Sequence, residues 1–257
     1  MKIYVWALWA ILTLIPLNLA NAGTHFFPYT FEQDASTPVP SLAGEEKVAQ
    51  AHPESGNASS IDGPSLPDFE SRFAKGSYQL GLTFGYGFSI NIPPVDAVSD
   101  ERTRLRFVHI APNFKYNLTG IMGKSIYRGA LYWVVEAAVA LTIDNPRRNN
   151  QPVDEAPTFL IALVPAQLEY KFVNPGRPWG IFVFAGMGGT WGDWFQETKE
   201  LATAFNFVLQ GGGGIEYFFA NGTALNFNYR LWHLSNSNIK GPNIGINAHI
   251  FGLGYSF

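Results

Sequence analysis

The chain has 257 residues, of which 47% are hydrophobic, 15% aromatic and 14% charged, and it has no cysteine. The charged share lies far below the roughly 25% of ordinary soluble domains, which indicates a protein that exposes apolar surface. The formal net charge of −3 argues against nucleic acid as a partner, because neutralising phosphates requires a basic surface. Without cysteine, no disulfide can contribute to stability.

Residues 1–22 have the pattern of a signal peptide. Met1 and Lys2 give a positive start, residues 3–19 are apolar, and residues 20–22 read Ala-Asn-Ala, a small-x-small cleavage site. The pattern therefore predicts that the protein is exported and that the mature chain begins at Gly23. Residues 23–75 are rich in Pro, Ser, Gly, Ala and acidic residues without a sustained period, so they are predicted to form a flexible N-terminal extension.

The rest of the chain, 76–257, is predicted to be a membrane barrel. Its most apolar segment, 129–143, is interrupted by Glu136, so no run reaches the 18 residues of a membrane helix. Eight segments of strand length occur instead, at 76–92, 104–118, 129–142, 158–173, 179–190, 204–219, 222–234 and 245–257. These segments predict an all-β fold, and their even number and the alternation of short and long connections are typical of outer-membrane barrels. We expect an eight-stranded antiparallel transmembrane β-barrel of the outer-membrane type, with both barrel ends of the chain in the periplasm.

Alternating residues support this prediction. In the first segment one face carries Tyr78, Leu80, Leu82, Phe84, Tyr86, Phe88 and Ile90, and the other face carries small and polar residues. Pro112 and Pro165 are expected to mark bulges or strand ends. Glu136, Glu216 and Arg230 have inward parity and are expected to form an ion-pair network in the interior, which side chains fill in a barrel of this size.

Polar residues break the apolar outer face near one hairpin. His233 and Ser235 have the outward parity of the seventh segment, and Asn247 has the outward parity of the last one. Residues two apart on a strand share a face, about 7 Å apart at Cα, so the three side chains converge. A hydroxyl, an imidazole and an amide are the nucleophile, base and orienting group of acyl-transfer sites. The alternative is an interfacial polar pair on a structural barrel, and His249 is expected to be an ordinary interfacial residue.

The motif resembles a known family. Residues 233–236 read His-Leu-Ser-Asn and residues 242–245 read Pro-Asn-Ile-Gly. Both resemble the lipid A 3-O-deacylases, outer-membrane barrels that remove an ester-linked acyl chain from lipopolysaccharide. The resemblance implies Ser235 as nucleophile and His233 as base, without a metal or cofactor. It also implies that three further residues shape the oxyanion site or its loop, namely Asn236, Asn243 and Gly245.

The chain departs from the deacylase pattern at position 247, where that pattern has Glu. Asn247 can orient an imidazole through a hydrogen bond but cannot stabilise the imidazolium by charge. We expect chemistry slower by one to two orders of magnitude, at about 1.4 kcal/mol per decade. Outer-membrane phospholipase A resembles the chain better at this position, because it combines His-x-Ser with a later Asn. Its barrel has twelve strands, however, and 76–257 holds about eight with their loops.

The predicted partner is lipid A, or lipopolysaccharide, in the outer leaflet. Its phosphates would require cations in the outer loops, for which the candidates are Arg102, Arg104, Arg147, Arg148 and Lys240. Trp191, Trp194 and Trp232 are expected in the aromatic belt. The terminal Phe257 resembles the signal read by the outer-membrane barrel assembly machinery. Two questions stay open, whether the barrel forms a homodimer and whether it is a non-catalytic anchor or adhesin.

Overall fold

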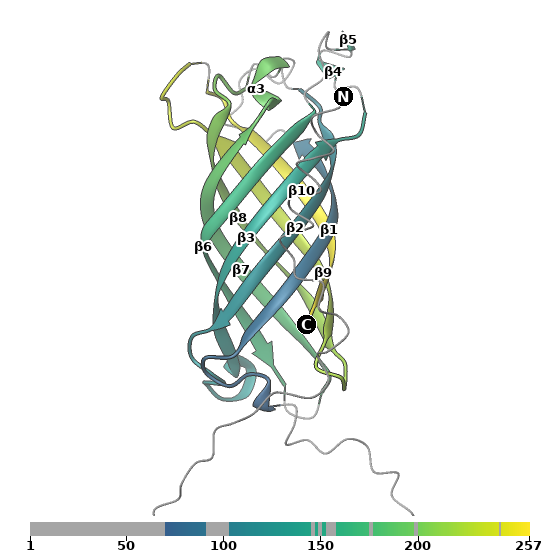
Figure 1. The fold of residues 1–257 in the computed structure, drawn as a ribbon, viewed down its shortest axis with the longest axis vertical. Coiled ribbons are helices and arrows are strands. Elements are labelled where there is room, and N and C mark those ends of the chain that lie inside the picture. The colour runs from purple at the N-terminus through teal and green to yellow at the C-terminus, as the bar shows by residue number, and fades with distance from the viewer. Residues whose placement is uncertain are drawn as a thin grey trace, which may run out of the picture. The chain divides into compact units, whose positions relative to one another are not determined.

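The computed structural model describes residues 70–90, 103–144, 147–148, 151–152, 158–174, 177–197, 200–241 and 243–257. Within them, eight long strands form one closed antiparallel barrel (Figure 1). The predicted signal peptide, 1–22, and residues 23–69 of the predicted extension lie outside the described residues. No helix in the described part of the chain is long and apolar enough to cross a membrane.

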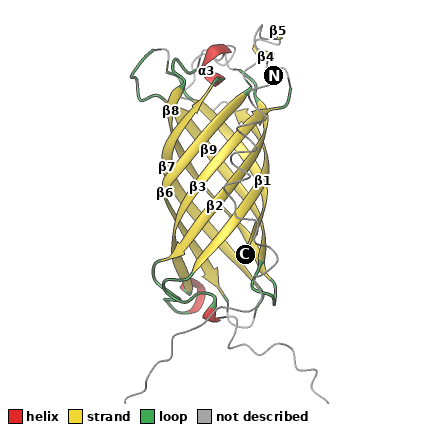
Figure 2. Cartoon of the chain, viewed as in Figure 1, coloured by secondary structure: helices red, strands yellow, loops and turns green. Residues whose placement is uncertain are grey.

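The strands of the barrel confirm the predicted fold class (Figure 2). They are β1 (Tyr78–Ile90), β2 (Arg106–Asn117), β3 (Gly129–Thr142), β6 (Phe159–Val173), β7 (Trp179–Gly192), β8 (Phe205–Phe218), β9 (Ala224–Ser235) and β10 (Ile246–Ser256). Successive strands of the barrel pair with each other, and β1 pairs with β10 to close the sheet. Closure leaves no strand edge unpaired, which a lipid environment requires.

Loops of different length mark the two ends of the barrel. The connections β1–β2, β3–β6, β7–β8 and β9–β10 lie at one end, here called the long-loop end, and the remaining turns at the other, the short-turn end (Figure 1). The long-loop end carries the short strands β4 (Arg147–Arg148) and β5 (Gln151–Pro152) and the helix α3 (Trp194–Glu197). The β2–β3 turn contains the 3-10 helix η2 (Ser125–Tyr127).

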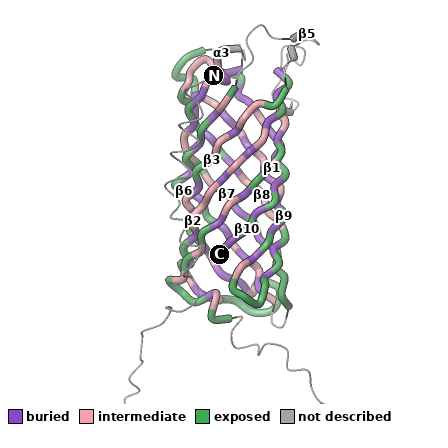
Figure 3. Tube along the Cα trace, turned by 45° about the vertical axis from the view of Figure 1, so that its right-hand side comes forward, coloured by how far each residue is buried: buried purple, intermediate pink, exposed green. Residues whose placement is uncertain are grey.

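Burial alternates along the strands of the barrel, as the inward and outward parity predicts (Figure 3). Of the two prolines expected at irregularities, Pro165 lies where the β6–β7 register shifts, between Leu163 and Ala166. The expectation for Pro112 is wrong. Pro112 pairs with Leu82 in an unbroken β1–β2 register, and the β2–β3 ladder resumes beyond it in the same register. Pro112 removes a backbone donor but inserts no extra residue.

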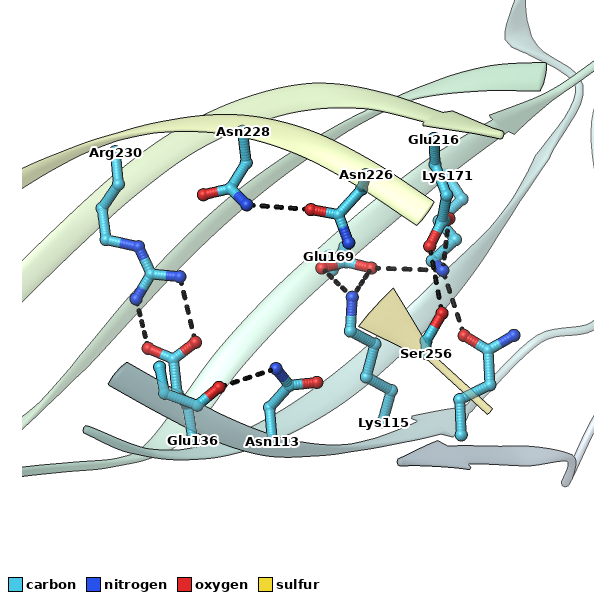
Figure 4. Close-up of polar contacts among 12 residues, drawn as sticks. Asn113, Lys115, Glu136, Glu169, Lys171, Glu216, Asn226, Asn228, Arg230 and Ser256 are labelled. Carbon is cyan, nitrogen blue, oxygen red and sulfur yellow. Dashed lines mark hydrogen bonds and ion pairs between the residues drawn. The ribbon is translucent and has the colours of Figure 1, made fainter. Parts of the chain in front are cut away.

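The middle of the barrel interior is a layer of charged pairs (Figure 4). Arg230 pairs with Glu136, at 3.0 Å between Nη2 and Oε2, as predicted. The predicted third member, Glu216, instead accepts a hydrogen bond of 2.6 Å from Lys171 Nζ. Lys115 Nζ donates to Glu169 at 2.7 and 2.9 Å. A cavity of about 20 Å³ remains among these side chains, which is room for about one water molecule.

Apolar clusters close the interior above and below this layer. Phe107 contacts Trp194 and Trp232 at the long-loop end, with ring centroids 5.0 and 6.3 Å apart. At the short-turn end the buried Phe73, which precedes β1, packs edge-on against Phe218 at 5.3 Å. The belt prediction is therefore wrong for Trp194 and Trp232, which are both 0% exposed. Trp232 has inward parity on β9, and α3 directs Trp194 into the barrel mouth.

Candidate active site

The outward end of β9 and the start of β10 bring the three predicted polar residues together on the outer wall. His233 lies directly opposite Asn247 in the β9–β10 register. Ser235 is the last residue of β9 and lies opposite Phe207 of β8. The intervening Trp232 and Leu234 are fully buried inside the barrel. Since side chains alternate across the wall, His233 and Ser235 must face outward together.

His233 and Asn247 form a hydrogen bond, with 2.8 Å between Nδ1 and Oδ1. Because an amide oxygen only accepts, Nδ1 carries the ring proton and Nε2 is left with its lone pair. This is the tautomer that a general base requires. Ser235 is not hydrogen-bonded to His233 in the described part of the chain, but its Cα lies about 7 Å away along the same face. Catalytic hydrogen bonds of this kind often tighten only when substrate binds.

The loop after Ser235 is held in shape by two asparagines. The Asn236 N–H donates to Asn243 Oδ1 at 2.8 Å, and Asn236 Nδ2 donates to the Lys240 carbonyl at 2.7 Å. Asn236 is fully buried. The next two residues, Ser237 and Asn238, have left-handed φ angles of 54° and 60°, which are uncommon for non-glycine residues, although asparagine adopts them more readily than most. Asn236 therefore uses its own N–H to fix this loop.

Gly245 packs directly beside the His233 ring. Its φ of +81° is one that glycine adopts without strain. A Cβ at this position would lie 2.9 Å from the Leu234 carbonyl oxygen and 3.1 Å from His233 Cε1. Glycine is therefore required for both the conformation and the space, and the backbone of Gly245 forms one wall of the histidine site.

An apolar groove of about 760 Å³ lies on the outer wall beside Ser235. Its apolar lining comes mainly from β6, β7 and β8 and includes Leu163, Met187, Trp191, Phe207 and Leu209, while Ser235 and Ser237 are also among the residues that line it. Ala166 and Gly189 leave space between these large side chains. Reasoning from the sequence missed this groove, although small residues at outward positions of two neighbouring strands were a signal for it.

A second polar pair lies further along the same face of β10. Tyr229 Oη and His249 Nδ1 are 2.6 Å apart, and the His249 ring lies 5.5 Å from the ring of Phe88. His249 is therefore engaged by Tyr229 and aromatic neighbours, whereas Asn247 is the hydrogen-bond partner of His233. His109 is buried in the interior with its ring edge-on to Trp232 at 5.0 Å.

The predicted phosphate-binding cations are only partly described. Arg104 and Lys240 are exposed at the long-loop end, and Lys240 also contributes its carbonyl to the site loop. Arg102 lies outside the described residues, and for Arg147 and Arg148 only the backbone of β4 is described. Among the described residues, no group of three or more His, Asp, Glu or Cys side chains could hold a metal ion.

Comparisons with known proteins found one family model and several solved structures that are similar to this chain. The family model for lipid A 3-O-deacylase (PagL) matches residues 108–256. The solved structure of the outer membrane enzyme PagL is 18% identical, with a TM-score of 0.43 over 68% of this chain and 98% of that chain. Neisserial surface protein A is 10% identical, with a TM-score of 0.45 over 70% and 95% of the two chains. OprG from Pseudomonas aeruginosa is 12% identical, with a TM-score of 0.37 over 71% and 97%. No curated protein sequence matches.

The family match covers more than half of the chain. It begins within β2 and ends with the last residue of β10, so it includes His233, Ser235 and Asn247. The chain belongs to the lipid A 3-O-deacylase family, and it is an outer-membrane β-barrel ester hydrolase that removes an acyl chain from lipid A.

Proposed function

We propose that Ser235, His233 and Asn247 carry out this deacylation at the 3-position of lipid A, on the lipid-facing wall of the barrel. The observation that carries the proposal is the 2.8 Å hydrogen bond between His233 and Asn247, which leaves His233 Nε2 free to accept a proton. Ionisable and polar side chains that face hydrocarbon are costly and mark functional sites. Ser235 shares this face and also lines the apolar groove.

The proposed reaction has two steps. His233 Nε2 takes the Ser235 hydroxyl proton while Oγ attacks the ester carbonyl of the acyl chain. The tetrahedral intermediate collapses, the bond to the sugar oxygen breaks, and His233 returns its proton to that oxygen. Water then attacks the acyl-serine with the same base, which releases the fatty acid and restores Ser235. Throughout, Asn247 holds the ring in the required orientation.

Oxyanion stabilisation needs backbone or side-chain donors close to Ser235. The N–H of Asn236 is committed to Asn243, so we assign this role to the N–H groups of Ser237 and Asn238. Neither donates to an acceptor in the described part of the chain, and the left-handed φ angles of both residues suit a backbone concavity that binds anions. Asn236 and Asn243 would then shape the oxyanion loop rather than contact the oxyanion.

The groove supports an amphipathic lipid substrate. Its apolar lining and its volume of about 760 Å³ suit an acyl chain that lies along the wall with its ester at Ser235. Outer-membrane barrels have long outer loops and short periplasmic turns, which would put the long-loop end at the cell surface. Lipid A phosphates would then meet the predicted cations of these loops, of which Arg104 and Lys240 are described and exposed.

Phe257 would contact the barrel assembly machinery during export. In the folded barrel its backbone exchanges two hydrogen bonds with Leu80, of 2.9 and 3.0 Å, while its side chain remains exposed. The terminal aromatic ring therefore stays accessible on the outer wall.

Mass spectrometry of lipid A tests the proposal. We expect lipid A from cells that produce the protein to lose the mass of one hydroxyacyl chain, compared with cells that lack it. Cells producing Ser235→Ala should retain that chain, while the variant still shows the heat-dependent gel shift of a folded barrel. Release of phospholipid fatty acids with unchanged lipid A would instead indicate a phospholipase. If neither lipid changes, the protein is a non-catalytic barrel.

A further inference from the structure

Glu200 occupies an unusual place for a carboxylate. It lies in the loop between β7 and β8, which folds over the mouth of the barrel at the long-loop end (Figure 1). Its side chain is buried, with the residue only 2% exposed, and Trp194 and Leu201 of the same loop are also fully or nearly fully buried. No cation in the described part of the chain pairs with it. A buried carboxylate without a cation is costly unless its oxygens accept good hydrogen bonds.

Those hydrogen bonds come from a different loop. The Thr103 N–H donates to Glu200 Oε1 at 2.5 Å, and Thr103 Oγ1 lies 3.1 Å from Glu200 Oε2. Thr103 belongs to the β1–β2 connection. The two bonds fix the position and orientation of the Glu200 carboxylate.

The backbone of Glu200 continues the connection to the candidate active site. The Gly245 N–H donates to the Glu200 carbonyl at 3.1 Å. Gly245 in turn forms the wall beside His233, where even a single added Cβ would lie 3.1 Å from Cε1. A continuous series of contacts therefore runs from Thr103 through Glu200 and Gly245 to the imidazole.

We propose that Glu200 is a positioning residue for His233. Its carboxylate anchors the β7–β8 loop to Thr103, and its carbonyl holds Gly245 against the ring, so that the imidazole keeps its position and orientation on the outer wall. The inference rests on the proposed function of Ser235 and His233. His233 has only an amide partner in Asn247, so its alignment depends on hydrogen bonds and packing rather than on attraction to a carboxylate. A misplacement of about 1 Å at a catalytic group costs up to about 100-fold in rate.

Three substitutions of Glu200 separate position from charge. Glu200→Gln keeps the length of the side chain but removes its charge. The amide can still accept a hydrogen bond from the Thr103 N–H and donate one to Thr103 Oγ1. Glu200→Asp keeps the charge but is one methylene shorter, and Glu200→Ala removes both. We expect Gln to retain kcat within about two-fold and Asp and Ala to lower kcat by about 10- to 100-fold, with KM unchanged. The assay is fatty-acid release by the purified full-length protein from lipid A in detergent micelles.

Asp193 provides a matched control in the same loop. Its carboxylate also anchors a neighbouring segment, since it accepts hydrogen bonds from the N–H groups of Thr158 and Phe159 at 2.8 and 2.9 Å. Asp193→Ala removes a comparable anchor that does not lead to Gly245, so it should leave kcat within about two-fold of wild type. The labelling rate of Ser235 by a fluorophosphonate should fall with kcat in Glu200→Ala and stay unchanged in Asp193→Ala.

Several results would overturn the inference. They are an active Asp variant with an inactive Gln variant, equal losses in Glu200→Ala and Asp193→Ala, or full activity in all Glu200 variants. If Glu200→Ala does not show the heat-dependent gel shift of a folded barrel, the comparison of Glu200→Gln with Glu200→Asp still separates position from charge. If wild type and Ser235→Ala release fatty acid equally, the proposed function itself fails. Dependence on Ser235 together with indifference to Glu200 would refute only the positioning role.

Discussion

At the scale of single residues, the proposed site combines the order of an acyl-transfer triad with a neutral third member. The Asn247 Oδ1 accepts a hydrogen bond from the Nδ1–H of His233, with 2.8 Å between the two atoms, so it selects the tautomer as a carboxylate would. It cannot offset the positive charge that His233 acquires when it accepts the Ser235 proton. The geometric and electrostatic roles of the third residue can therefore be separated at position 247.

Asn247→Glu is expected to raise kcat by about 10-fold, because a carboxylate stabilises the imidazolium by about 1.4 kcal/mol for each decade in rate. Asn247→Ala removes the orienting bond and should lower kcat instead. Both rates are measured as fatty-acid release from lipid A in micelles. A complete loss of activity in Asn247→Glu, with the barrel folded, would argue against an orienting role for this position.

At the scale of elements, neighbouring strands build the apolar groove, the proposed substrate site, from contrasts in side-chain size. Gly189 of β7 lies opposite Leu163 of β6 and Phe207 of β8, all with outward parity. The absent side chain leaves a hollow between large apolar residues in an otherwise bulky wall. The width of the groove, and with it the acyl chain that fits, depends on this position.

Gly189→Leu should fill the groove and lower kcat/KM for long acyl esters by about 10-fold, the scale on which small changes in an apolar pocket discriminate, while short esters are unaffected. The added Cβ would lie 3.0 Å from the Phe205 ring, a side chain that can move. Rates with p-nitrophenyl esters of increasing chain length measure the effect. Ala185→Leu, on the same face of β7 but outside the groove, serves as control, and an equal loss there would contradict the assignment.

At the scale of the whole molecule, the interior has three layers. Apolar clusters around Phe107 and Phe73 close the two ends, and the charged pairs lie between them (Figure 4). Arg230 of β9 reaches Glu136 of β3 across the barrel interior, whereas the two lysine pairs each span one intervening strand. The filled interior and the cavity of only about 20 Å³ make the barrel a rigid support for a site on its outer wall.

Arg230→Met should destabilise the barrel by about 3 kcal/mol or more, because it leaves Glu136 buried without its cation. Adding Glu136→Leu should recover much of this loss, since buried pairs can often be replaced by apolar residues. The free energy of unfolding is measured by urea titration in detergent micelles. A double variant less stable than Arg230→Met would show that Arg230 and Glu136 are not each other's main partners.

The sequence by itself determined the strand number, the face of each side chain and the convergence of His233, Ser235 and Asn247. These features depend on the two-residue period of a strand and on a single hairpin, both of which are local. Only the tertiary structure decided the features that join distant segments. The order of the strands brought Glu169 to Lys115 and Glu216 to Lys171, each across one intervening strand. Loop folding buried Trp194 and brought Glu200 to Gly245. The groove likewise needs three strands side by side, and no local pattern specifies which side chains meet across a closed barrel.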